Sequence, residues 1–582
     1  MKRISLLGIV SALAFGLNAC GDDNSSSSPV DLIDVESSAV VDDGLSSSSA
    51  APLSGCSASL PGSSASLLGS SESLPGSFAA ESSDSVTQNS SAADSSSVNS
   101  SSGKNPAESS SGAGVSSSSV ALGDTTAKVA YSLKPFKGPL ANPHKGFTLL
   151  TEGAWNFVPE FEFGPDKNGA WNVITYGSGY QRWDKLNPGK GVYDWSVLED
   201  LLNVLQEHGL GYALRVFPYS PSYIRNSSTP ASEYDWTPEW VYEEGAKRDT
   251  AVFQDNGVRA QVPAWEDPVY LKAAKDFATA LAAKYDGDPR LEYIDVRTFG
   301  EWGEWHVSHL DGSDMPSLKI QKEILDHYAS VFKKTLLALP SDAYGEIYTY
   351  ALGLGITKRD DGFIGIPGTA DSLVRAYKAG LPTIAENIGS YERMLTFDNH
   401  SYMRWTPERW VHEITTAHLT YYVLEQESDC GFQIYSEHKD LVDSMTHVIG
   451  YNFKVEKAEL LTIASDKETT NTLNITVKNT GIAPCFFDVY VVAEFVDNTG
   501  AVLEQLGQTV KVSKGTFKDE MVKEFSFANS VPAKQTNVAA LPGVSVSLSI
   551  YESEDAFKSG KNPTVRFDND GLQANNKLLL KP

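Results

Sequence analysis

Two glutamates and two tryptophans alternate in a short stretch near the middle of the chain. The segment 291–306, LEYIDVRTFGEWGEWH, begins with apolar and β-branched residues typical of a buried strand, and it breaks at Gly300. Glu301 and Glu304 follow, each next to an indole. A carboxyl group packed against apolar rings can keep its proton at neutral pH and protonate a glycosidic oxygen. A structural strand end with solvated glutamates is the alternative, so an active site requires a second carboxylate elsewhere.

A second carboxylate ends a later apolar run. Glu386 closes the segment 383–386 in the stretch LPTIAENIGS. Cleavage of a glycosidic bond needs one carboxyl group as general acid and another as nucleophile or base. We expect Glu301 to be the acid because it lies nearest the strand, with Glu304 as its substitute, and Glu386 to be the second carboxylate.

Several other residues are candidates to bind substrate. Arg215 lies in an apolar run and could orient an acid or hydrogen-bond to substrate, and His306 is expected to hydrogen-bond to substrate. Trp302 and Trp305 could stack on sugar faces, although core packing explains any single tryptophan at least as well, and Trp183 is expected to bind substrate. These five residues form the predicted binding set.

No cofactor or metal is predicted. His306, His309 and Asp311 could ligate a metal ion, but a two-residue gap in a loop is a weak signal. Asp360 and Asp361 could contact substrate, although a turn cap is the favoured interpretation. The sequence contains nothing that resembles a Ser-His-Asp elbow, a P-loop or a dinucleotide-binding motif.

Strand-like and helix-like segments alternate between residues 127 and 450, which predicts a parallel sheet with crossover helices. The predicted strands are 145–150, 172–176, 211–217, 293–299, 346–350, 355–357 with Phe363, 383–386 and 431–435. Eight such units over roughly 300 residues fit an α/β fold of the (β/α)₈ barrel type. Glu301 then follows the fourth strand and Glu386 ends the seventh, at the edge where barrel enzymes carry their catalytic groups.

Residues 451–582 have a different character. Alternating apolar residues, such as Leu473, Ile475 and Val477, and turn residues between the segments predict an antiparallel β-sandwich. All eleven tryptophans and all ten histidines lie before this region. We therefore expect the sandwich to be an accessory domain and the barrel to carry the chemistry.

The N-terminal region predicts export. Lys2 and Arg3 precede a mostly apolar run, 4–17, that is too short to span a membrane, and Cys20 follows. Residues 1–20 resemble a bacterial lipoprotein signal in which Cys20 is lipidated; an ordinary secretory signal is the alternative. Residues 21–126 are dominated by serine and predict a disordered linker. The expected location is the bacterial cell envelope, with a lipid anchor in the outer membrane or at the cell surface.

Composition narrows the partners. The chain has 47 basic and 74 acidic residues, a net charge of −27, which argues against nucleic acid as a partner. Four cysteines, two of them in the first 56 residues, leave no disulfide framework. A carbohydrate substrate and the membrane, through the lipid anchor, are the expected partners.

The barrel region resembles known hydrolases. Within 180–195, YQRWDKLNPGKGVYDW, the spacing of Trp183, Leu186 and Pro188 before GVYDW is similar to the second βα loop of clan-A glycoside hydrolases. With Glu301 and Glu386, the similarity is nearest to β-galactosidases of the family 42 type. The chain from 135 onward also resembles an uncharacterised bacterial secreted family with a barrel and a terminal sandwich, on the motifs at 142–147 (NPHKGF), 300–306 (GEWGEWH) and 479–484 (NTGIAP).

One residue departs from the clan-A pattern. The acid of those enzymes usually follows an asparagine that binds the sugar 2-hydroxyl, whereas Gly300 precedes Glu301 here. A Gly-Glu pair is closer to inverting β-amylases, so the stereochemical outcome and the choice between Glu301 and Glu304 stay open. The resemblance implies a surface lipoprotein that cleaves glycosidic bonds of a polysaccharide or oligosaccharide with two carboxylates. The alternative is a non-catalytic carbohydrate-binding lipoprotein on a degenerate barrel.

Overall fold

The computed structural model describes residues 125–149, 167–424 and 430–582. The predicted signal segment, Cys20 and nearly all of the predicted linker lie outside these ranges. Among the described residues, no helix is both long enough and apolar enough to cross a membrane.

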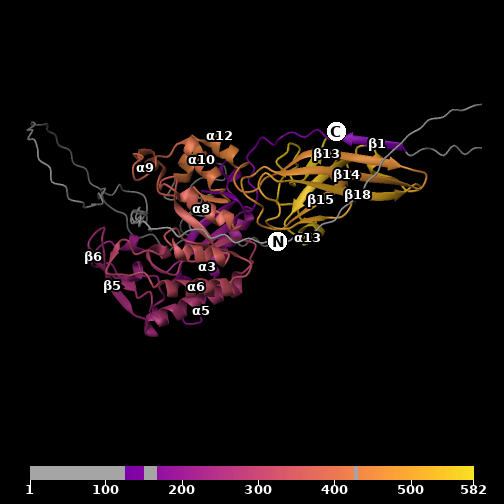
Figure 1. The fold of residues 1–582 in the computed structure, drawn as a ribbon. Helices are drawn as coiled ribbons and strands as arrows, with labels where there is room; N and C mark the ends of the chain where they lie inside the picture. The colour runs from indigo at the N-terminus through magenta and orange to yellow at the C-terminus, as the bar shows by residue number, and fades with distance from the viewer. Residues whose placement is uncertain (1–124, 150–166, 425–429) are drawn as a thin grey trace, which may run out of the picture. The chain divides into compact units, whose positions relative to one another are not determined.

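Eight parallel strands form the barrel that carries the site (Figure 1). Their order in the sheet is β2-β12-β11-β10-β9-β7-β4-β3. A parallel bridge between Phe147 of β2 and Ile174, just before β3, brings the two outer strands together. The predicted (β/α)₈ class is therefore confirmed. The strands are β2 (Gly146–Thr148), β3 (Tyr176–Arg182), β4 (Gly211–Phe217), β7 (Leu291–Asp295), β9 (Leu336–Leu339), β10 (Thr357–Phe363), β11 (Ile384–Asn387) and β12 (Tyr421–Val423).

Amphipathic helices connect the barrel strands. In α3 (Ser196–Glu207), Leu198, Leu201, Leu202 and Leu205 are buried, which is the spacing of one helix face. Asp267 caps α5 (Pro268–Tyr285) by accepting hydrogen bonds from two backbone N–H groups of its first turn. The other helices are α2 (Trp183–Leu186), α4 (Glu239–Glu243), α6 (Leu318–Val331), α7 (Glu346–Gly353), α8 (Thr369–Lys378), α9 (Tyr391–Thr396), α10 (Pro407–Thr416), α11 (Cys430–Glu437) and α12 (Lys439–Met445).

Two of the eight predicted strands are helices. The segment 346–350 lies in α7, and 431–435 lies in α11. Aromatic and β-branched residues favoured strands there, but in α7 they bury Ile347, Tyr348 and Ala351 on one helix face. The true fifth and eighth strands, β9 and β12, have only four and three residues, which is too short for periodicity to detect. The second strand begins at Tyr176, where the predicted one ends.

The C-terminal region consists of two antiparallel sheets. The first has the order β1-β13-β14-β18; the second has the order β16-β15-β19-β20, with β17 on β15. Leu473, Ile475 and Val477 are all buried in the core that the two sheets share, as predicted. The bounds are β13 (Phe453–Ala464), β14 (Glu468–Asn479), β15 (Val489–Val496), β16 (Val502–Gln505), β17 (Val510–Val512), β18 (Val522–Pro532), β19 (Ser545–Tyr551) and β20 (Leu578–Leu580), with α13 (Glu554–Lys558) after β19.

One strand of this region comes from before the barrel. β1 (Thr125–Ala130) pairs antiparallel with β13 over its whole length. The predicted barrel domain begins at residue 127, but the structure pairs these residues with the C-terminal sheet. The chain therefore contributes to the terminal region both before and after it builds the barrel.

Three further strands form a separate small sheet. β5 (Arg248–Phe253) pairs with β6 (Val258–Pro263) and with β8 (Leu310–Asp311), all antiparallel. β8 follows the loop that contains Glu301. Its pairing with β5 therefore joins the hairpin of β5 and β6 to that loop.

Candidate active site

The loop after β7 turns sharply, which decides where its two glutamates point. Gly300, Trp302, Gly303 and Trp305 all have positive φ, between 50° and 79°. A Cβ atom at Gly300 would lie 2.2 Å from the backbone oxygen of His306. An asparagine at this position is therefore excluded by backbone strain and by collision, which explains the departure from the clan-A pattern.

Hydrogen bonds hold this loop in place. The backbone N–H of Glu301 donates to the carbonyl of His306 at 2.9 Å, and that of Trp305 donates to Phe299 at 3.1 Å. Arg297 Nη1 donates to the carbonyl of Trp302 at 2.9 Å. The loop is thus closed on itself and fixed to the end of β7.

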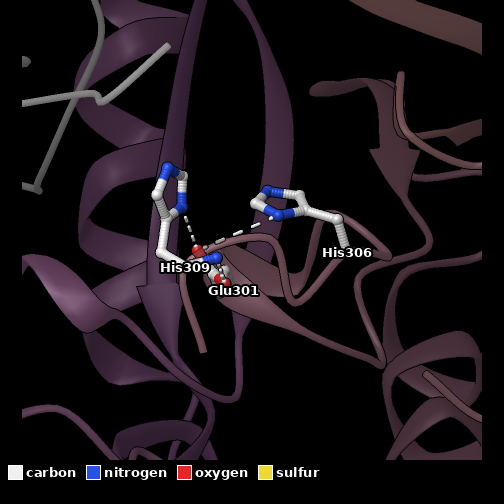
Figure 2. A group of neighbouring side chains, drawn as sticks. All are labelled: Glu301, His306 and His309. Atoms are coloured by element: carbon white, nitrogen blue, oxygen red, sulfur yellow. Dashed lines mark hydrogen bonds and ion pairs between the residues drawn. The ribbon is translucent and has the colours of Figure 1, made fainter. Parts of the chain in front are cut away.

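Glu301 is enclosed by two histidines (Figure 2). It is fully buried, and its Oε1 accepts the backbone N–H of His309 at 2.7 Å. Its Oε2 lies 2.6 Å from Nδ1 of His309 and 3.8 Å from Nδ1 of His306. A carboxylate with no exposed surface and these neighbours is poorly placed to protonate a substrate.

Glu304 faces a different environment from Glu301. Its side chain is 17% exposed, and its Oε1 accepts hydrogen bonds from Arg297 Nη1 at 2.9 Å and Arg359 Nη2 at 3.3 Å. Burial raises the pKa of Glu304, but the charges of Arg297 and Arg359, with the hydrogen bond and charge of His306, together outweigh burial and hold the pKa well below its usual range. Glu304 is therefore a carboxylate at neutral pH.

Arg359 of β10 is the centre of the charged cluster. Its Nη1 donates to Oε2 of Glu386, at the end of β11, and its Nε donates to Asp295 Oδ2 at 2.8 Å. Arg215 of β4 also donates to both oxygens of Glu386, at 3.2 and 3.3 Å. Carboxylates at the ends of β7 and β11 thus converge on one buried guanidinium.

Asp361, two residues beyond Arg359 on β10, completes this cluster. Its Oδ2 lies 3.5 Å from Arg359 Nη2, and the hydroxyl of Ser341 donates to its Oδ1. Burial, followed by the negative charge of Glu304, raises the pKa of Asp361 to about 6. Asp361 is therefore a carboxyl group that can hold a proton close to neutral pH.

The guanidinium limits the distance between these carboxyl groups. Glu386 bonds Nη1, whereas Glu304 and Asp361 bond Nη2. The two nitrogens are about 2.3 Å apart, so the contacting oxygen of Glu386 lies within roughly 9 Å of the others. This range includes the carboxyl separations of both retaining and inverting glycosidases.

The three tryptophans that were predicted to bind substrate lie in different surroundings. Trp302 is half-buried, and its Nε1 donates to Ser222 at 3.0 Å. Trp305 is buried and donates to the carbonyl of Val296, and Trp183 packs on Tyr270 and Phe277. Of these three tryptophans, Trp302 is therefore the one that is not buried.

Among the described residues, two groups of side chains have ligand atoms within 4.8 Å of one another. The first is Glu301, His306 and His309; the second is Glu304, His306 and Asp342. Asp311 belongs to neither, because it accepts a hydrogen bond from Gln254 at 2.6 Å.

Sequence reasoning singled out Arg215 but missed the other arginines that organise the site. Arg297, Arg359 and Asp295 were not singled out, and a turn cap was favoured for Asp361. The sequence does contain a signal for Arg359 and Asp361. The barrel strand β10 carries four charged residues in succession, Lys358, Arg359, Asp360 and Asp361. Four consecutive charged residues in a buried strand require partners, because isolated charges are costly to bury.

Comparison with known proteins supports the class of the barrel. Residues 171–302 match the model of a family described as β-galactosidase, glycoside hydrolase family 42. The match includes β3, β4 and β7 and ends inside the loop of Glu301. No protein of curated function matches the chain.

The solved structures that match the chain include three carbohydrate-active enzymes. A family 30 subfamily 8 xylanase from Clostridium acetobutylicum is 11% identical, with 68% of this chain and 95% of that chain covered and a TM-score of 0.29. The β-amylase catalytic domain from Paenibacillus polymyxa is 9% identical (49% and 93% covered, TM-score 0.31). A β-galactosidase from Marinomonas ef1 is 10% identical (48% and 55% covered, TM-score 0.29). With the family match, the fold defines a glycoside-hydrolase-like (β/α)₈ barrel.

Proposed function

We propose that the barrel hydrolyses O-glycosidic bonds of an oligosaccharide or polysaccharide with the carboxyl groups held around Arg359. The observation that supports this proposal is the convergence of Glu304, Asp361 and Glu386 on one guanidinium. Glu304 lies in the loop after β7, and Asp361 and Glu386 lie near the C-terminal ends of β10 and β11, at the edge where barrel enzymes carry their catalytic groups.

The surroundings of these groups assign their roles. A general acid must hold a proton near the working pH, whereas a nucleophile or base must be ionised. Asp361, with a pKa of about 6, is the proton donor in this proposal. Glu386, between the cations of Arg215 and Arg359, is the carboxylate that attacks the anomeric carbon or activates water. If water is the nucleophile, Glu304 is the alternative base to Glu386.

The general-acid role thus moves from Glu301 to Asp361. Glu301 is fully buried, and both of its oxygens are engaged by His309. Asp361 retains 13% exposure of its side chain and lies against the same guanidinium as Glu386. Trp302, half-buried on the loop, is the proposed surface for stacking on a sugar ring.

The test is hydrolysis of a panel of aryl glycosides and polysaccharides by the full chain. Wild-type protein should cleave at least one member, and Glu386→Gln and Asp361→Asn should each lower kcat/KM on that substrate by about 10²-fold or more. Glu392→Gln, an exposed change on α9, is the matched control. Hydrolysis that survives both substitutions would refute the assignment. The anomer released first would separate retention from inversion.

A non-catalytic carbohydrate-binding role is the second candidate. The observation in its favour is the double contact of Glu386 with Arg215 and Arg359, because two cations reduce the nucleophilicity of a carboxylate. In that case calorimetry should detect saturable binding to a polysaccharide that the protein does not cleave. Loss of that binding in Trp302→Ala would support the binding role.

We also propose that Cys20 carries a lipid that anchors the protein in the bacterial cell envelope. The support is the sequence alone: the basic residues, the apolar run and Cys20 in order. Labelled fatty acid should be incorporated into the wild-type protein and not into Cys20→Ala. Membrane fractionation that is unchanged in Cys20→Ala would contradict the anchor.

A further inference from the structure

The histidines around Glu301 form a group that glycoside hydrolysis leaves unexplained. We propose that Glu301, His306 and His309 bind a divalent transition-metal ion, with Zn²⁺ as the natural probe. This inference does not rest on the proposed hydrolysis, because Glu301 is not one of the reacting carboxyl groups.

The three ligand atoms face a common point (Figure 2). Oε2 of Glu301 lies 2.6 Å from Nδ1 of His309 and 3.8 Å from Nδ1 of His306. Ligand atoms in a tetrahedral zinc site are about 3.3 Å apart, given metal–ligand distances of about 2.0–2.1 Å. The two observed distances lie on either side of that value, and the ligand atoms of all three side chains lie within 4.8 Å of one another.

The surroundings orient these ligands. The backbone N–H of His309 holds Oε1 of Glu301 at 2.7 Å, which turns Oε2 toward both rings. The backbone N–H of Ser308 donates to Nδ1 of His306 at 3.3 Å, so this nitrogen presents a lone pair, and an ion would take the place of this hydrogen bond. Nε2 of His306 lies 3.7 Å from Oε2 of Glu304. A carboxylate behind a ligating imidazole is the usual support of a metal-bound histidine.

The charge distribution favours this group over the second candidate. Among the ion pairs of the described residues, Glu301 takes part only in those with His306 and His309. Glu304, in the other group, contacts Arg297 and Arg359, and these guanidinium groups would repel a cation. We therefore place the metal ion in the group of Glu301, His306 and His309, and not in the group that contains Glu304.

The donor set indicates the class of ion. Two imidazoles and one carboxylate suit Zn²⁺ and other first-row transition ions, whereas Ca²⁺ and Mg²⁺ prefer oxygen ligands. Three protein ligands also leave a coordination position open. In this loop the ion would join Glu301 to two residues up to eight positions later and so fix the turn from which Glu304 projects.

The experiment is a Zn²⁺ titration of the full chain, prepared without a histidine tag and stripped with a chelator. We expect one ion per chain, and at least about 10-fold weaker binding in Glu301→Gln and in His309→Gln. Asp311→Asn is the matched control, since Asp311 lies in the same segment but contacts Gln254. It should bind as the wild type does.

A second measurement avoids dependence on how well the variants fold. The X-ray absorption spectrum of Zn²⁺-loaded wild-type protein should show two imidazole ligands, oxygen ligands and no sulfur. No stoichiometric binding, a spectrum without two imidazoles, or unchanged affinity in folded Glu301→Gln and His309→Gln would each overturn the site. Weaker binding in the Asp311→Asn control alone would also overturn it.

Discussion

The two glutamates of one loop belong to regions with different chemistry. Glu301 lies in a histidine region, where its partners are His306 and His309. Glu304, three residues later, lies in an arginine region with Arg297 and Arg359. Guanidinium groups stay charged at every physiological pH, whereas imidazoles can be neutral and bind metals. The two regions should therefore respond differently to substitution, pH and metal ions.

The difference arises from backbone geometry and not from local composition. Both glutamates stand in the same Gly-Glu-Trp sequence. The left-handed residues Trp302 and Gly303 turn the chain between them, so that Glu301 is fully buried and Glu304 keeps 17% of its side-chain surface exposed. A repeated motif can thus place identical residues in two different sites.

The largest effect is expected in the arginine region. Arg359→Lys keeps one charge but cannot reach Asp295, Glu304, Asp361 and Glu386 together, so buried carboxylates lose their partner. We expect activity to fall by more than about 10³-fold and the free energy of unfolding to fall by about 3–5 kcal/mol. Arg375→Lys, an exposed change on α8, is the control. Equal losses in both variants, measured by kinetics and denaturation, would contradict a special role for Arg359.

Asp361→Asn tests the proton donor. Because Asp361 has a pKa of about 6, we expect wild-type kcat/KM to fall as the pH rises above about 6. Asp361→Asn should lose about 10²–10³-fold in kcat/KM and should lack this decline. Asp371→Asn, an exposed change on α8, should keep the wild-type profile. A decline that persists in Asp361→Asn would assign the acid to another group.

The same carboxyl group affects stability with a defined sign. Its pKa is raised above the ordinary value of 3.8, so the folded protein holds more protons than the unfolded chain between pH 4 and 6. Its contribution to stability is therefore complete below about pH 4 and is lost as the pH rises through about 6. Asp361→Asn should raise the unfolding temperature at pH 8 by about 2–4 °C. A lower unfolding temperature would show that its contact with Arg359 outweighs its burial.

Gly300→Ala tests the turn that separates the two regions. Gly300 and Gly209 both have positive φ, but only at Gly300 would a Cβ meet backbone atoms. We expect Gly209→Ala to cost about 1 kcal/mol from strain alone and Gly300→Ala to cost at least about 2 kcal/mol more. Denaturant unfolding of both variants measures the difference. Equal costs would mean that the loop moves aside easily.

The smallest effect on hydrolysis is expected from the exposed indole. Trp302→Ala should raise KM by about 10-fold with little change in kcat, because stacking binds substrate and transition state alike. Trp305→Ala should instead lower the free energy of unfolding by about 3–5 kcal/mol, because Trp305 is buried. Reversed effects, in kinetics and in unfolding, would exchange the roles of the two indoles.

The sequence predicted the barrel, and it predicted that Glu386 ends a barrel strand, because both follow from local patterns. The run Gly211–Phe217 was predicted with its exact bounds, and Glu386 lies in β11 as expected. The strands β9 and β12 were missed because four and three residues carry no measurable period. β9 and β12 are recognised as strands by their pairing with neighbouring strands, which are distant in the sequence.

The partners inside the site were harder to predict for the same reason. Arg215 and Arg359 are more than 100 residues apart, yet both donate to Glu386 because β4, β10 and β11 end at one edge of the barrel. The burial of Glu301 depends on four left-handed residues, two of which are tryptophans. No rule on composition predicts a tryptophan in that conformation, because the region is unfavourable for bulky side chains.

The most direct test of the account compares kcat/KM of Glu386→Gln and Glu301→Gln on a glycoside that the wild-type protein cleaves. If the arginine region carries hydrolysis, Glu386→Gln should lose about 10³-fold or more, while Glu301→Gln should lose less than about 10-fold. A loss in Glu301→Gln as large as or larger than that in Glu386→Gln would place the chemistry in the histidine region and contradict the account.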